Sequence, residues 1–179
     1  YGSPQLTFRE SVEPIYLGFV DLLLQRAASL PTREQYEPYL IEARETVEMV
    51  KIAELRDYFQ DECMAAIQSR VTRLDTISKT TVVVYPIVLP DRTELLVSLP
   101  EGLKRFLIPI GADTLTQEIR QFRWKLEKRT TREYLPHAQR LYDWLLGPLE
   151  PDLKSLPIDT LVFVPDGPLR IIPMSALHD

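Results

Sequence analysis

The first third of the chain, from residue 8 to about residue 68, places apolar residues at the spacing of amphipathic helices. One set recurs three or four residues apart and predicts a single apolar face: Val12, Ile15, Tyr16, Phe19, Leu22, Leu23 and Ala27. Residues 30–32, Leu-Pro-Thr, interrupt this pattern. A second set then predicts one long amphipathic helix: Leu40, Ala43, Val47, Val50, Leu55, Phe59, Cys63 and Ala66.

The start of the second helix can be placed at either of two positions. Thr32 and Gln35 have the spacing of a capping box, whereas Pro38 could instead lie in the first turn and mark a later start. Two helices joined by a short turn resemble a helical-hairpin repeat, and one such unit cannot bury both of its faces. We therefore assign residues 1–78 to a helical, repeat-like linker region and expect further helices before it in the native protein.

The pattern changes near residue 80, where β-branched and aromatic residues dominate. Residues 80–89, 94–99 and 104–110 each predict a strand, and short turns separate them. This arrangement predicts an antiparallel meander. Pro86 has no N–H to donate, so we expect the first strand to have an edge or bulged position there.

Two further helices are predicted after the strands. Asp113 is the expected N-cap of the first, whose apolar stripe is Leu115, Ile119, Phe122 and Leu126. The second begins at about Glu133, ends at Gly147 and Pro148, and turns these residues inward: Tyr134, Ala138, Leu141, Tyr142 and Leu145. A short helical turn over residues 150–156 follows.

The closing stretch contains a strand, residues 161–164, that is apolar at every position. Such a strand is typical of a parallel sheet covered on both faces, and leaving its four side chains in water would cost about 6–12 kcal/mol. The meander can supply only one neighbour, so we expect the rest of the sheet to come from residues after Asp179 or from another chain. Residues 165–168 predict a turn, 169–172 an extended segment, and 173–177 the start of a helix.

Composition and charge argue against several classes of function. The net charge of −5 argues against a general binder of nucleic acid or of anionic membranes. A cluster of basic residues is interspersed with glutamates and is interpreted as a solvated helix face: Arg120, Arg123, Lys125, Lys128, Arg129 and Arg132. The single cysteine and the two histidines exclude an intrachain disulfide and do not suggest a zinc site. No apolar run is long enough to span a bilayer, and no signal peptide opens the chain, so a cytoplasmic protein is expected.

Few residues qualify as catalytic candidates. Cys63 falls on an apolar helix stripe and is interpreted as a buried core residue, and His137 is expected to be partly exposed. Ser175, His178 and Asp179 have the residue types of a serine triad, but triad members converge from separate elements rather than from one short turn. The adjacent acids Asp61 and Glu62 point to different helix faces.

Asp166 and Gly167 follow the carboxyl end of a strand, and these residue types indicate a turn rather than a catalytic pair. The turn could shape a loop near an active site at that end of the sheet. Arg170 could serve either structure or substrate binding. From the residues alone, no catalytic residue, cofactor site or metal site is assigned.

The sequence LVFVPDGPLRIIPMSALHD resembles the opening motif of CHAT domains, the caspase-like modules that follow tetratricopeptide repeats. The likeness extends to the long helix ARETVEMVKIAELRDYFQDEC, to the strands VVVYPIVLPDRTELLVSLPEGLKRFLIPI and to the helix YLPHAQRLYDWLLGPLEPDL. By this resemblance, residues 79–179 form the N-terminal, incomplete part of a CHAT domain. The fold class is then α/β: a helical hairpin, an antiparallel meander, two helices and the first strand of a caspase-like sandwich.

The resemblance implies a bacterial cysteine endopeptidase, a hydrolase of the thiol protease class with a His–Cys dyad. The family places the His in a His-Gly motif and the Cys in a Ser-Ala-Cys-type motif, both downstream of these residues, and neither motif occurs here. It further implies a protein substrate, a regulatory protein bound by the helical repeats, and a second polypeptide completing the domain if the chain ends by self-cleavage. The alternative is a non-catalytic interaction scaffold with the same fold.

Overall fold

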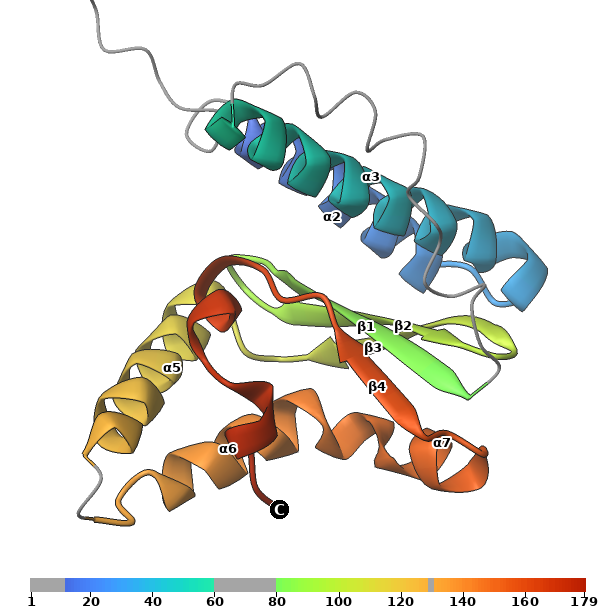
Figure 1. The fold of residues 1–179 in the computed structure, drawn as a ribbon. Helices are drawn as coiled ribbons and strands as arrows, with labels where there is room; N and C mark the ends of the chain where they lie inside the picture. The colour runs from blue at the N-terminus through green and yellow to red at the C-terminus, as the bar shows by residue number, and fades with distance from the viewer. Residues whose placement is uncertain (1–11, 60–79, 129–130) are drawn as a thin grey trace, which may run out of the picture. The chain divides into compact units, whose positions relative to one another are not determined.

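The computed structural model describes residues 12–59, 80–128 and 131–179 (Figure 1). Contacts within the chain divide it into two compact units, residues 1–73 and residues 74–179, and each is described by itself. The boundary predicted after residue 78 lies outside the described residues. No helix of the described ranges is both long and apolar enough to cross a bilayer.

The first unit contains helix α2, Glu13–Ala28, and helix α3, Arg33–Phe59, which pack side by side (Figure 1). The helix α3 begins directly after Thr32, whose carbonyl accepts hydrogen bonds from the N–H groups of Gln35 and Tyr36. Pro38 lies inside this helix, so the prediction that it could mark the start is wrong. Proline costs the helix one backbone hydrogen bond there, because it has no N–H to donate.

The predicted apolar stripe of α2 is only partly correct. Its buried residues are Val20, Leu23, Leu24 and Ala27, whereas Ile15 is 72% exposed and Leu22 is 64% exposed. Apolar residues occupy more than one face of this helix, and packing in the folded chain selects the face that is buried. On α3 the predicted positions Leu40, Ala43, Val47 and Val50 are buried, but Leu55 is exposed.

The second unit is built on a four-stranded sheet in the order β3-β2-β1-β4. Strands β1 (Thr81–Val88), β2 (Thr93–Leu99) and β3 (Gly102–Ile108) form the predicted antiparallel meander, with Tyr85 opposite Leu96 and Leu95 opposite Phe106. The fourth strand β4 (Thr160–Phe163) pairs with β1 in parallel, and Val82 lies opposite Leu161.

Pro86 lies in a strand with neighbours on both sides, and the place where β4 ends explains how it is accommodated. The carbonyl of Val84 accepts the N–H of Val164, so even-numbered residues of β1 direct their backbone groups toward β4. The strand β4 ends at Phe163, opposite Val84, and therefore stops short of Pro86. The missing N–H costs no ladder bond, and the predicted edge position is correct locally.

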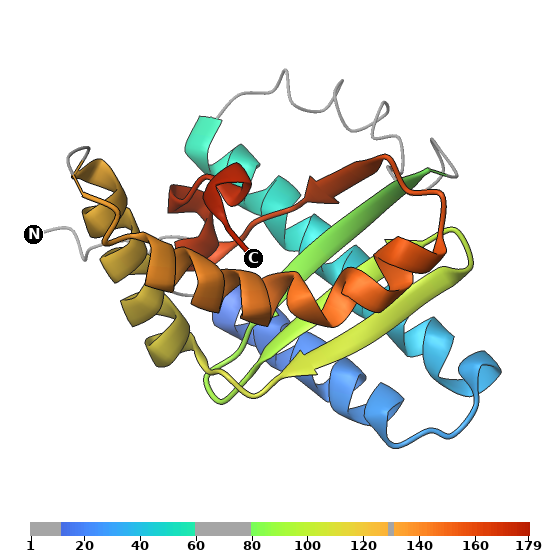
Figure 2. The same ribbon diagram turned by 90° about the horizontal axis from the view of Figure 1, so that it is seen from below.

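Helices α5 (Ala112–Glu127), α6 (Leu135–Leu145) and α7 (Glu150–Ser155) follow the meander. Figure 2 shows α6 lying across the strands on one face of the sheet. The core between helices and sheet contains the predicted stripe residues of both longer helices: Leu115, Ile119, Phe122, Ala138, Leu141 and Leu145. The sheet contributes Val82, Val84, Leu95 and Val97.

The start of α5 differs from the prediction. Its N-cap is Gly111 rather than Asp113, and Asp113 lies in the first turn. A Cβ atom on Gly111 would lie 2.2 Å from the carbonyl oxygen of Pro90, so only glycine fits there. The Ala112 N–H donates to the Leu89 carbonyl at 3.0 Å, and the Thr93 hydroxyl donates to the Ile110 carbonyl at 2.8 Å. The β1–β2 turn thus fixes where the helix begins.

The C-terminal segment departs most from the prediction. The strand β4 has β1 as its one neighbour in the described residues and Leu161 is 37% exposed, so the neighbour expected from outside these residues stays a prediction. The segment predicted as extended is a 3-10 turn, Gly167–Ile171, and the predicted helix start is a 3-10 turn, Met174–Ala176. Prolines 168 and 173 break up this stretch, and Leu169 is drawn into the core.

Candidate functional site

The candidate site is the loop that follows β4, at the carboxyl end of the parallel strand pair. Ligand sites in open α/β sheets form at this end of the strands. Val164 extends the pairing with β1 by one residue, through its N–H to the Val84 carbonyl at 2.9 Å. The chain then leaves the sheet through Pro165 and turns at Asp166. The position of the predicted turn is therefore confirmed.

Asp166 holds this turn together. Its Oδ1 atom accepts the N–H of Gly167 and the guanidinium of Arg170, both at 2.8 Å, and its carbonyl accepts the N–H of Leu169. Gly167 has a φ of +48°, the left-handed region that glycine adopts at least cost, as the sequence predicts. Leu169 is fully buried in the core and anchors the far end of the turn.

This geometry gives the loop a scaffolding role. An Asp166 carboxylate that already accepts two hydrogen bonds from its own turn is poorly placed to act as a general base. Arg170, whose side chain is 35% exposed, is fixed by the same carboxylate. The loop can therefore present a fixed backbone and a positioned guanidinium at the sheet edge, but it holds no nucleophile.

The residue types of a serine triad at the C-terminus do not assemble. Ser175 is exposed in its 3-10 turn, and no hydrogen bond joins it to His178 in the part of the chain that the structure describes. The His178 ring is 60% exposed and contacts its neighbour Asp179. Cys63, Asp61 and Glu62 lie outside the described residues.

His137 is part of an ion-pair cluster that the sequence analysis did not identify. Its Nδ1 atom lies 2.7 Å from one carboxylate oxygen of Glu118, and the other oxygen accepts from Arg140 at 2.8 Å. The His137 side chain is 20% exposed, consistent with the predicted partial exposure. The cluster joins α5 to α6, and only the packed helices bring its members together, so sequence spacing gives no signal for it.

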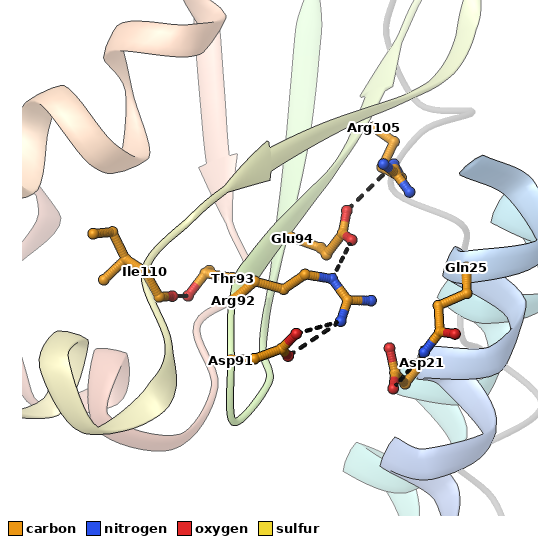
Figure 3. A network of polar contacts seen from close by, with 8 residues as sticks. All are labelled: Asp21, Gln25, Asp91, Arg92, Thr93, Glu94, Arg105 and Ile110. Atoms are coloured by element: carbon orange, nitrogen blue, oxygen red, sulfur yellow. Dashed lines mark hydrogen bonds and ion pairs between the residues drawn. The ribbon is translucent and has the colours of Figure 1, made fainter. Parts of the chain in front are cut away.

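A buried carboxylate in the sheet was also missed. Glu94 in β2 is fully buried and accepts from Arg92 Nε at 2.8 Å, and its second oxygen lies 3.3 Å from Arg105 Nε (Figure 3). Arg92 also contacts Asp91. A buried charge needs paired partners, and two guanidiniums supply them here. A charged residue within the otherwise apolar strand TELLVSL was the available signal.

Polar contacts also fasten α7 to α6. Tyr142 donates its hydroxyl to Glu150 at 2.8 Å, which raises the pKa of Tyr142 above its usual value. The hydrogen bond from Lys154, followed by that from Tyr142, lowers the pKa of Glu150. On α5, a hydrogen bond from Lys125 likewise lowers the pKa of Glu133. These are surface contacts of secondary elements, and within the described residues no group of three or more metal-ligating side chains is present.

Comparison with protein families identifies a similarity. The family model of the CHAT domain matches residues 135–179, the stretch from the start of α6 through β4 and the Asp166 turn to Asp179. No curated protein matches the chain. The match confirms, for these residues, the resemblance that the sequence predicts. This part of the chain is therefore similar in sequence to the CHAT domain, a caspase-like, protease-related domain.

Proposed function

We propose that this chain supplies the N-terminal part of a caspase-like cysteine endopeptidase domain, together with a helical linker that binds a regulatory protein. The observation that carries the proposal is the CHAT match over residues 135–179, on a segment that forms a parallel strand and a braced loop at its carboxyl end. In the proposed enzyme the His–Cys dyad is contributed by residues outside this sequence.

The chemistry needs a thiolate to attack the scissile carbonyl and an imidazole to protonate the leaving amine, after which water hydrolyses the thioester. In the proposed enzyme, the residues of this chain position other groups and transfer no proton themselves. The strand β4 offers an edge with which the next strand of the sheet can pair. The Asp166 turn fixes the loop that follows β4. Arg170 holds its guanidinium at this edge, where an anionic group of a substrate could bind.

The helical hairpin is the proposed site for the regulatory protein. Ile15, Phe19 and Leu22 lie three and four residues apart on α2, and each is 43% exposed or more. Exposed apolar residues at this spacing fit the apolar face of another helix. In the proposed enzyme, binding at this face changes the activity of the protease domain.

The experiment uses the full-length native protein and a protein substrate such as casein. We expect iodoacetamide to abolish cleavage, because a catalytic thiolate is alkylated readily. The matched control is Cys63→Ser, which removes the one cysteine of this sequence and should leave cleavage within about twofold of the parent. Cleavage that survives iodoacetamide, or that disappears with Cys63→Ser alone, would refute the proposal.

A second candidate function is a non-catalytic interaction scaffold with the same fold. The exposed stripe of α2 favours it, because that surface can bind a partner without any dyad. The same experiment discriminates the two functions. A full-length protein that loses a bound partner upon Leu22→Asp, but cleaves no substrate in either form, would support the scaffold.

A further inference from the structure

The outward face of α5 carries a tryptophan flanked by cations. Trp124 is 52% exposed, an unusual position for so large an apolar side chain. Arg120 lies four residues before it and Lys128 four residues after it, and both are exposed. Residues four apart are neighbours on a helix surface, so the three form one stripe, called here the Trp124 stripe.

The cations hold the indole ring in place. The ammonium of Lys128 lies 3.6 Å from the centroid of the Trp124 ring, and that of Lys125 lies 4.9 Å from it. Such cation–π contacts are attractive at these distances. The stripe is therefore partly ordered before any partner arrives, which lowers the entropy cost of binding.

The charges around the stripe are unevenly balanced. Arg123 is paired with Glu127 at 3.0 Å, and Lys125 is paired with Glu133. By contrast, within the described ranges neither Arg120 nor Lys128 lies at ion-pair distance from a carboxylate, and Lys128 acts on Glu133 only from farther away. A chain whose net charge is −5 thus presents on this face the Arg120 guanidinium and, over the hydrophobic ring, the Lys128 ammonium.

We infer that the Trp124 stripe binds an acidic segment of a partner protein. The Lys128 ammonium lies over the Trp124 ring, and Arg120 lies one helical turn, about 6 Å, before Trp124, so both cations border the indole. In an extended peptide, residues two apart point to the same side and lie about 7 Å apart, so carboxylates on either side of an apolar residue can pair with both cations. An apolar residue between the two carboxylates then contacts the exposed part of the indole, and tryptophan and arginine are both residue types enriched in binding hot spots.

A single-stranded nucleic acid fits this face less well. Bases bind by stacking on an open aromatic face, and Lys128 occupies a face of the Trp124 ring. The carboxylates of Glu127 and Glu133 border the stripe and repel a continuous phosphate backbone. A short acidic segment carries two carboxylates instead of a continuous row of phosphates, so it meets less of this repulsion. This inference concerns residues outside the CHAT match and does not depend on the proposed peptidase.

The test follows the fluorescence of Trp124 during titration with the blocked peptide Glu-Ser-Leu-Ser-Glu. Trp144→Phe serves as the background, because the chain has two tryptophans and this change leaves Trp124 as the sole reporter. We expect saturable binding. Arg120→Gln and Lys128→Gln should each weaken it about fivefold, the effect of losing one surface ion pair. If Trp144→Phe does not fold, calorimetric titration of the unaltered chain and the same glutamine variants replaces the fluorescence.

The matched control is Arg123→Gln, which removes the same charge from the same helix at a residue already paired with Glu127. Binding of this variant should stay within about twofold of the parent. Three results would overturn the inference: no binding by the folded chain, an equal loss with Arg123→Gln, or tighter binding of a uridine oligonucleotide than of the peptide.

Discussion

The strands β1 and β4 lie side by side and are both rich in large apolar residues, yet their burial differs. Val82 in β1 is fully buried, whereas Leu161, directly opposite it in β4, is 37% exposed. Paired residues of parallel strands point to the same face, so composition and orientation do not explain the difference. The strand β1 has β2 on its other side, and β4 has no second neighbour in the described residues. Burial is set by the neighbours that a strand acquires in the fold.

The largest expected effect comes from comparing Gly111, at the start of α5, with Gly167, in the Asp166 turn. In Gly111→Ala the new Cβ would lie 2.2 Å from the Pro90 carbonyl, so the β1–β2 turn must shift, at a cost of about 3 kcal/mol or more. Gly167→Ala meets no atom within 4 Å and bears only the strain of its φ of +48°, about 1 kcal/mol. Urea denaturation measures both free energies of unfolding. Equal costs would mean that the turn at Pro90 is not rigid.

The next comparison truncates the opposed pair itself. Val82→Ala should cost about 2 kcal/mol, because it leaves a cavity between the sheet and the helices. Leu161→Ala removes more atoms but should cost less than about 1 kcal/mol, because much of that side chain already faces solvent. Thermal and urea unfolding of the two variants provide the measurement. A cost for Leu161→Ala as large as for Val82→Ala would show that β4 is covered in solution, as the sequence analysis predicts for a completed sheet.

The sequence predicted the fold correctly where the spacing of apolar residues within one element leaves only one face that can be buried. The helix α5 buries Leu115, Ile119 and Phe122 as predicted, because polar residues fill most of its other positions, with Trp124 the one large apolar exception on the exposed side. On α2 the period was right but the buried face was partly wrong, since apolar residues such as Ile15 and Leu22 lie on a face that stays exposed. There the choice between faces depends on packing, which spacing does not encode.

The candidate site shows the same division. The turn at Asp166 and Gly167 was predictable, because its chemistry is local: one side chain accepts the next N–H, and one glycine adopts a positive φ. The contact between His137 and Glu118 was not, since nineteen residues separate them and only the packing of α5 against α6 joins them. The pairing of Glu94 with Arg105 depends in the same way on the register of β2 against β3.

The smallest expected effect concerns the polar contacts that hold α7, the element leading into β4. The pKa of Glu150 is lowered from 4.5 in the folded chain, so its contribution to stability is present above about pH 4.5 and is lost as the pH falls through the lowered pKa. The pKa of Tyr142 is raised, so the phenol remains a neutral donor until the pH rises through that higher value.

Removing the hydroxyl by Tyr142→Phe tests this contact. The urea midpoint of the variant should lie slightly below that of the parent at neutral pH, since one partly buried hydrogen bond is lost. The gap should narrow as the pH falls below 4.5, because a protonated Glu150 accepts this hydrogen bond less strongly than the carboxylate. A gap that stays constant from neutral pH to well below 4.5 would show that the Tyr142–Glu150 bond does not form in solution. In that case packing alone, through buried Leu149, would hold the chain that leads into β4.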